Sequence, residues 1–242
     1  MTDAELASVI ATEAGELLRS IRAESAPCRA LGDRGDREAN DLILGRLAAA
    51  RPGEFVLSEE SADDRQRCGA RRVWIVDPLD GTRDYAEGLD DWAVHVGLAL
   101  DGVPAIGAVA LPMRLRTFAS HMPVALPPKR AGRMRMTVSR TRCPAVAERV
   151  ATTLDAALVP MGSAGAKAMA VLEGRADIYL HAGGQYEWDN CAPAAVAIAA
   201  GLHVSRIDGS PLAYNCADPL LPDLLICRPE LADDVLAAVR QA

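Results

Sequence analysis

The chain has 242 residues, which allows one large domain or two smaller lobes that share a core. Half of the residues are apolar and 24% are charged, so a globular fold is expected. The formal net charge of −7 argues against an overall nucleic-acid binder, because nucleic-acid phosphates repel an acidic surface.

The chain begins with two predicted helices. Thr2 and Glu5 form a capping box ahead of apolar residues spaced three and four apart, which predicts a helix to about Ile21. The Gly- and Asp-rich stretch 31–36 predicts a break. A second helix is expected from about Arg37 to Ala50, before the Pro-Gly pair at 52–53.

Strand patterns follow in the next segment. Short apolar runs predict strands over 54–58 and 72–76, and Asp101-Gly102 joins two longer runs, 92–100 and 103–111, as an antiparallel hairpin. The Pro-containing stretch 121–132 is expected to connect two lobes. We therefore expect an N-terminal lobe of residues 1–125 and a C-terminal lobe of residues 133–242.

Helices and strands alternate in the second half. A strand over 135–138 precedes a helical pattern through Ala157, and a Gly-Ser-Ala-Gly turn at 162–165 opens a helix to about Glu173. The remaining predictions are strands over 177–180, 203–204 and 224–226, and helices over 190–200 and 230–240. Such alternation after an antiparallel section favours a layered α/β or α+β architecture.

The middle of the chain is strongly basic. No acidic residue lies between Asp101 and Glu148, whereas this stretch holds Arg114, Arg116, Lys129, Arg130, Arg133, Arg135, Arg140 and Arg142. This asymmetry leaves open a non-catalytic module that binds RNA or protein, although nucleic acid is an unlikely partner for the whole acidic chain.

The sequence also predicts a cellular location. No apolar run approaches the ~20 residues that span a bilayer, and the acidic start lacks the basic region of a secretory signal. Six scattered cysteines form no CxxC pair, so reduced thiols are expected. We expect a cytoplasmic protein without a membrane partner.

The most informative segment is Asp77-Pro78-Leu79-Asp80-Gly81-Thr82, directly after an apolar run. Pro78 fixes the backbone and Gly81 allows a tight turn, so two carboxylates, a carbonyl and a hydroxyl gather beyond a strand end. Hard cations such as Mg²⁺ bind this set of oxygens. For the motif taken alone, a solvated turn is the alternative.

Further acids stand at Glu59-Glu60 and at Asp189. Taken singly, the pair is typical of solvated surface and Asp189 of a helix N-cap. If Glu59 and Asp189 converge with the two aspartates of the preceding motif, the repulsion among the carboxylates is severe without bound cations. Two cations about 4 Å apart would relieve it and form a phosphoryl-transfer site.

Two segments, 77–82 and 187–193, resemble the signatures of the inositol monophosphatase superfamily of Mg²⁺-dependent, lithium-sensitive phosphatases. Three more resemble its bacterial members that act on 3′-phosphoadenosine 5′-phosphate, the CysQ-type 3′(2′),5′-bisphosphate nucleotidases: 81–85, 138–141, and Gly162-Ser163 with Lys167. The resemblance implies the layered αβαβα sandwich of inositol monophosphatase and fructose-1,6-bisphosphatase, an α+β fold. It also implies two or three Mg²⁺ ions per active site and allows a homodimer.

The resemblance assigns the metal ligands position by position. Glu59, Asp77 and the backbone carbonyl of Leu79 would hold the first metal. Asp77, Asp80 and Asp189 would hold the second.

It also assigns the catalytic groups. Glu59 and Thr82 would orient and activate the attacking water, with Asp36 hydrogen-bonded to Thr82. The backbone amides of Gly81 and Thr82 would grip the scissile phosphate. Water would attack in line without a covalent intermediate.

The implied substrate contacts are Gly81, Thr82, Arg83, Ser139, Arg140, Ser163, Lys167 and Asp189. A lysine one turn into a helix after a Gly/Ser-rich turn can meet an anion together with free amides. Position 83 is Arg where the nucleotide branch has Lys, and Arg142 stands where it has His. These departures affect substrate choice rather than metal binding.

The histidines lack metal-ligand spacing and are expected to be structural. The sequence thus predicts a metal-dependent phosphatase that converts 3′-phosphoadenosine 5′-phosphate to AMP and phosphate in sulfate assimilation. Inositol 1-phosphate and fructose 1,6-bisphosphate remain alternative substrates for the same mechanism.

Overall fold

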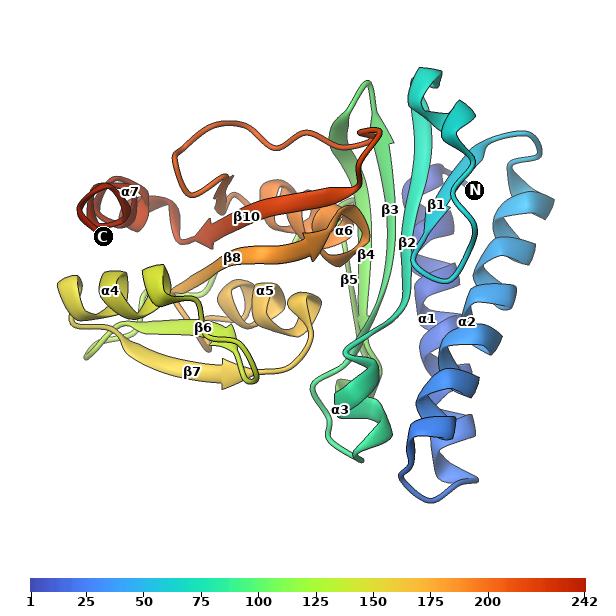
Figure 1. Cartoon of the computed structure of the whole chain (residues 1–242), viewed down its shortest axis with the longest axis horizontal. Helices are drawn as coiled ribbons and strands as arrows, with labels where there is room; N and C mark the ends of the chain where they lie inside the picture. The colour runs from blue at the N-terminus through green and yellow to red at the C-terminus, as the bar shows by residue number, and fades with distance from the viewer.

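Helices and sheets alternate in five layers across the molecule (Figure 1). The computed structural model describes all residues from 1 to 242. One helix pair covers the outer face of the first sheet, a second pair lies between the sheets, and a third covers the outer face of the second sheet. In that order the pairs are α1 (Asp3–Ala23) with α2 (Arg29–Ala50), α5 (Ala164–Leu172) with α6 (Glu187–Ala199), and α4 (Ala145–Thr153) with α7 (Ala232–Gln241). The predicted layered α+β sandwich is confirmed.

The first sheet follows the chain order. Its strands are β1 (Phe55–Ser58), β2 (Arg72–Asp80), β3 (Ala93–Leu100), β4 (Val103–Leu111) and β5 (Arg116–Ala119). β1 and β2 are parallel and the other pairs are antiparallel. The predicted hairpin joins β3 and β4, whereas β5 was not predicted. Three short helices accompany this sheet: η1 (Arg65–Gly69), α3 (Thr82–Ala86) and η2 (Pro112–Arg114).

The second sheet has the order β7-β6-β8-β10-β9. Its strands are β6 (Arg135–Ser139), β7 (Ala157–Met161), β8 (Ile178–Tyr186), β9 (His203–Ser205) and β10 (Leu220–Cys227), and a short helix η3 (Pro229–Leu231) precedes α7. β6 is parallel to β7 and β8, and β10 is antiparallel to β8 and β9. The two-lobe division remains a prediction, because α5 and α6 pack against both sheets.

The predicted break at residues 31–36 is wrong, because α2 runs through it. Gly32 and Gly35 do not end a helix; they allow neighbouring side chains to pack closely against α2. A Cβ on Gly35 would lie 3.0 Å from the Leu18 side chain, and one on Gly32 would lie 3.0 Å from the Thr82 methyl group. Tertiary contacts here override the low helix propensity of glycine.

The predicted helix through Ala157 is also wrong. α4 ends at Thr153, and residues 157–161 form strand β7. β7 lies at the edge of its sheet, where Pro160 removes no central ladder hydrogen bond. Farther along, α6 begins at Glu187, so Asp189 lies in its first turn rather than ahead of the helix.

Two glycines let α6 lie directly on the first sheet. Gly97 and Gly107 face each other across β3 and β4. A Cβ on Gly107 would overlap the carbonyl group of Ala192, and a Cβ on Gly97 would lie 3.1 Å from the Ala192 nitrogen. Contact between helix and sheet backbones therefore sets the position of α6 over the sheet.

Two further features bear on the expectations above. None of the helices combines the length and apolar character that crossing a membrane requires. All six cysteines are free thiols.

Candidate active site

β2 carries two of the predicted metal ligands across a β-bulge. Asp77 pairs with His95 on β3 and Asp80 pairs with Ala93, so β2 advances one residue more than its partner. Residues three apart in a regular strand face opposite sides, and the extra residue turns both aspartates the same way. Pro78, which has no N–H to donate, lies within the irregular stretch.

Three carboxylates converge beyond this bulge. Asp77, Asp80 and Asp189 each offer an oxygen, and the three oxygens lie within 4.8 Å of one another. Asp77 is buried and accepts a hydrogen bond from the Leu79 amide at 3.0 Å. Asp189 accepts one from the Tyr186 amide at 2.5 Å in the first turn of α6. The geometry therefore joins the two signature segments in one site.

The acids repel one another. Burial, followed by the charges of Glu59 and Asp80, raises the pKa of Asp77 well above its ordinary value. Burial and the charge of Asp80 raise the pKa of Asp189 to about 6. In the metal-free protein, both carboxyl groups therefore keep a proton to a higher pH than an ordinary aspartate does.

Asp80 differs because the second half of the chain supplies hydrogen bonds to it. Its Oδ2 accepts from the Ser163 hydroxyl at 2.5 Å and the Gly165 amide at 2.8 Å, and lies 3.2 Å from His95 Nε2. Burial alone would raise the pKa of Asp80, but His95, Lys167 and the Ser163 hydroxyl together lower it. This role of His95 was not predicted, although the pairing of β2 with β3 could have indicated it.

Glu59 lies at the edge of the cluster, outside the set of three. It directly follows β1, and its amide donates to the Val76 carbonyl at 3.4 Å. Although the residue is exposed on one side, desolvation by its neighbours and repulsion from Asp189 and Asp36 raise the pKa of its carboxyl to about 8. Glu59 therefore adds a fourth carboxyl group beside the three that converge.

The donor set fits a hard divalent cation. Carboxylate oxygens and the Leu79 carbonyl are the ligand type that Mg²⁺ prefers. The buried Asp77 carboxylate receives only one hydrogen bond and has no basic partner in an ion pair. Its raised pKa means that protons and a cation compete for the same oxygens.

A hydroxyl and a carboxylate flank this cluster. The Thr82 hydroxyl lies 2.9 Å from Asp36 Oδ2 and 3.0 Å from the Leu79 carbonyl oxygen. Burial raises the pKa of Asp36 to about 7, against the lowering effect of its hydrogen bond with Thr82. Gly81 precedes α3 with a φ of +92°, and a Cβ there would lie 3.0 Å from the Asp91 carbonyl oxygen.

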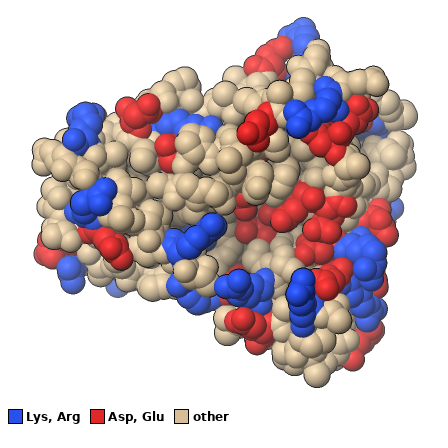
Figure 2. All heavy atoms as spheres, viewed as in Figure 1, with Lys and Arg blue, Asp and Glu red and all other residues tan.

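The predicted substrate contacts other than Asp189 all line one pocket of about 290 Å³: Gly81, Thr82, Arg83, Ser139, Arg140, Ser163 and Lys167. Figure 2 shows acidic side chains gathered in the hollow between the two halves, with Lys and Arg side chains beside them. Lys167 is buried, and its Nζ donates to the Ser163 carbonyl at 2.7 Å and to the Gly162 carbonyl at 3.3 Å. Burial lowers the pKa of Lys167 to about 8.

The arginines of this pocket differ in how they are engaged. Arg140 forms ion pairs with Asp84, which also lines the pocket, and with Asp91. Arg142 lies outside the pocket lining, and its side chain donates only to the Gly184 carbonyl, at 3.5 Å. Arg83 is exposed and forms no hydrogen bond or ion pair through its side chain. Arg83 is thus the arginine of the pocket wall that is free to meet an anion.

Much of the basic middle segment is neutralised by the rest of the fold. Arg114 and Arg116 pair with Glu173, and Arg133 pairs with Asp155. With Arg140, four of the eight basic residues form ion pairs. Half of the basic charge that would attract a phosphate backbone is therefore already neutralised within the fold.

Comparison with known proteins gives consistent matches. A model of the inositol monophosphatase family matches residues 4–242. The chain is 53% identical to a 3′-phosphoadenosine 5′-phosphate phosphatase of Mycobacterium tuberculosis over 241 residues, 95% of this chain and 90% of the relative. A protein of the same name from Mycobacterium leprae is 50% identical over 256 residues, 100% of this chain and 94% of the relative. The crystal structure of CysQ from Bacteroides thetaiotaomicron superposes with a TM-score of 0.80 at 26% identity, covering 93% of this chain and 97% of that one.

Proposed function

The chain belongs to the inositol monophosphatase family, and from that premise we propose that it is a Mg²⁺-dependent phosphatase that converts 3′-phosphoadenosine 5′-phosphate to AMP and phosphate. The observation that carries the proposal is the convergence of Asp77, Asp80 and Asp189 beside a pocket walled by basic side chains. The names of the relatives at 50% and 53% identity support the choice of substrate.

The chain's own groups account for metal binding. We assign Asp77, Asp80 and Asp189 to one cation, and Glu59, Asp77 and the Leu79 carbonyl to another. Mg²⁺ bound there supplies positive charge to the phosphate oxygens and lowers the pKa of water, so that water can attack at neutral pH.

Thr82 and Asp36 orient the attacking water in this proposal. With the Thr82 proton held toward Asp36 Oδ2, the Thr82 oxygen is free to accept a hydrogen bond from water. Glu59 accepts a second hydrogen bond from the same water. The backbone amides of Gly81 and Thr82, at the start of α3, donate to the scissile phosphate.

The opposite wall of the pocket accounts for substrate choice. Lys167 presents a buried ammonium group to the site, and Arg83 presents an unpaired guanidinium at its rim. A substrate with a second phosphate would make charge-assisted hydrogen bonds there that a monophosphate lacks. We further propose a cytoplasmic enzyme of sulfate assimilation, with a homodimer as the expected assembly.

The decisive experiment compares phosphate release from 3′-phosphoadenosine 5′-phosphate, myo-inositol 1-phosphate and fructose 1,6-bisphosphate in the presence of Mg²⁺. We expect the nucleotide to have the highest kcat/KM and Asp80→Asn to remove most of the activity. Asp90→Asn, at a carboxylate that is 70% exposed, is the matched control. If the nucleotide ranks last, the assigned substrate is wrong, and if Asp80→Asn is fully active, so is the assigned site.

A further inference from the structure

Arg67 on η1 is an arginine whose side chain is completely buried. A guanidinium removed from water is stable only when its N–H groups find acceptors. Its Nε and Nη2 donate to the two carboxylate oxygens of Asp63 at 2.6 and 2.9 Å. Its Nη1 donates to Asn215 Oδ1 at 2.9 Å and to the Cys216 carbonyl at 3.0 Å. Arg67 thus joins two segments that are 148 residues apart in the chain.

The same segment is held from its other side by Glu187, the first residue of α6. Glu187 is fully buried, and its two carboxylate oxygens accept from the amides of Asn215 and Cys216, each at 2.7 Å. The Asn215 side chain donates back to the Arg67 carbonyl at 2.8 Å. Residues 215 and 216 therefore form a bridge between η1 and the start of α6.

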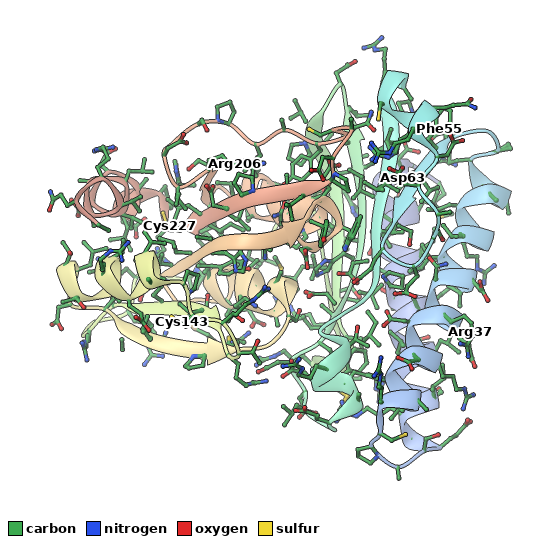
Figure 3. All side chains as sticks on the ribbon, viewed as in Figure 1. Arg37, Phe55, Asp63, Cys143, Arg206 and Cys227 are labelled. Atoms are coloured by element: carbon green, nitrogen blue, oxygen red, sulfur yellow. The ribbon has the colours of Figure 1, made fainter.

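Each end of this bridge leads to an acid of the active site. On one side, Asp63 lies four residues after Glu59 in the segment between β1 and η1, where Figure 3 labels it. On the other side, Glu187 precedes Asp189 by two residues in the first turn of α6. The network therefore links the Glu59 segment to the helix that carries Asp189.

The two ends are not held equally. α6 rests on the first sheet through backbone contact at the glycine pair, which is independent of Arg67. The Glu59 segment is held by single hydrogen bonds instead: the Glu59 amide donates to the Val76 carbonyl at 3.4 Å, the Ser58 hydroxyl donates to Asn40 at 2.7 Å, and the Asn40 amide donates to Ser61 at 3.1 Å. β1 itself pairs only with β2. Loss of the Arg67 contacts should therefore displace Glu59 more than Asp189.

We propose that Arg67 is a positioning residue that fixes Glu59 relative to Asp189 and so sets the spacing between the two cation sites. The inference rests on the proposed function, in which Glu59 and Asp189 belong to different cations. Arg67 acts through Asp63 and the 215–216 bridge and touches neither substrate nor metal.

The test substitution is Arg67→Lys, which replaces the planar guanidinium and its several N–H donors by one ammonium group. Lysine keeps the charge but cannot reach Asp63, Asn215 and the Cys216 carbonyl together. Mn²⁺ binding without substrate, followed by the electron paramagnetic resonance signal of the free ion, should show one class of site weakened about tenfold. The Mg²⁺ concentration for half-maximal phosphate release should rise by a similar factor, with kcat at saturating Mg²⁺ within about threefold of the original. Arg71→Lys, at a side chain that is 83% exposed and pairs with Asp101 outside this network, should change neither quantity.

Unchanged Mn²⁺ affinity in a folded Arg67→Lys protein would overturn the proposal, as would a loss of kcat that saturating Mg²⁺ does not restore. If Arg67→Lys fails to fold, Asp63→Asn tests the same link, because it weakens the attachment of the Glu59 segment and leaves the Arg67 bonds to residues 215 and 216. A folded Asp63→Asn protein with normal Mn²⁺ affinity refutes the inference. If the unaltered protein binds no Mn²⁺, both the proposed metal-dependent function and this inference fail. If the unaltered protein binds Mn²⁺ and neither substitution changes the affinity, only the inference is refuted.

Discussion

The active site has two walls, the carboxylate cluster and the basic lining of the pocket beside it, and they are built in opposite ways. On the acidic wall, Asp77 and Asp189 face one another without a basic side chain in an ion pair, and their pKa values are raised. On the basic wall, two of the three cations already have partners within the fold. Lys167 donates to backbone carbonyls, and Arg140 pairs with Asp84 and Asp91. The acidic wall is thus incomplete without a bound cation, whereas the basic wall is largely satisfied by the protein itself.

The walls also differ in what holds them in place. The acidic wall depends on backbone geometry: the bulge in β2, and the glycine pair under α6. The basic wall depends on side-chain hydrogen bonds and ion pairs across the pocket. Substitutions on the acidic wall should therefore act on metal binding and kcat, and those on the basic wall on KM and substrate choice.

The largest effect is expected from Asp77→Asn. Loss of a ligand shared by both cations should lower kcat/KM about a thousandfold or more, equivalent to several kcal/mol of transition-state stabilisation. In a chelator, however, the melting temperature should stay constant or rise, because a neutral amide replaces a buried carboxylate among like charges. Phosphate-release kinetics and thermal melts measure the two effects, with Asp90→Asn as the exposed control. A clear loss of metal-free stability would show that Asp77 supports the fold rather than opposes it.

A smaller effect, on KM, should distinguish Arg83 from Arg140 on the basic wall. Arg83→Ala should raise KM for 3′-phosphoadenosine 5′-phosphate about tenfold more than for 3′-AMP, because a charge-assisted hydrogen bond to the second phosphate is lost. Arg140→Ala should change both KM values alike, because its guanidinium already serves Asp84 and Asp91. The measured quantity is the ratio of the two KM values for each variant. The reverse pattern would mean that substrate breaks the Arg140 ion pairs.

The smallest effect concerns pH. The pKa values of Glu59 (about 8), Asp36 (about 7) and Asp189 (about 6) all exceed those of ordinary carboxyl groups. A raised pKa stabilises the protonated folded state, so this contribution is complete below about pH 4 and is lost as the pH rises through the folded pKa values. Mg²⁺ should therefore raise the melting temperature by a few degrees more at pH 8 than at pH 6. If Mg²⁺ raises the melting temperature equally at pH 6 and pH 8, these carboxyl groups take no part in metal binding.

The acidic wall could be predicted from the sequence because its ligands lie in compact motifs. The segment 77–82 and the aspartate at 189 carry residue types whose chemistry is specific to oxygen-coordinated cations. The expected family, the α+β fold and the phosphatase activity that these motifs indicate are confirmed. The fourth acid, Glu59, lies beside the cluster of three rather than within it.

Other parts of the site depend on contacts between distant residues, which single-sequence patterns do not encode. Arg140 meets Asp84 across 56 positions, and Arg67 meets Asn215 across 148. His95 approaches Asp80 only because of the register between β2 and β3. The wrong prediction of a helix break at Gly32 and Gly35 has the same cause, because these glycines permit close tertiary packing that local helix propensity does not describe.

The hydrogen bonds to Asp80 tie the active site to the folding of the whole chain. Asp80 ends a strand of the first sheet, but Ser163 and Gly165, which donate to it, belong to the start of α5 more than 80 positions later. A nascent or cleaved chain that ends before α5 would hold the carboxylates of β2 without these donors, and of the partners that favour the Asp80 carboxylate it would keep only His95. Activity then arises only when both sheets are assembled, so phosphate release reports complete folding rather than the folding of the half that carries most of the ligands.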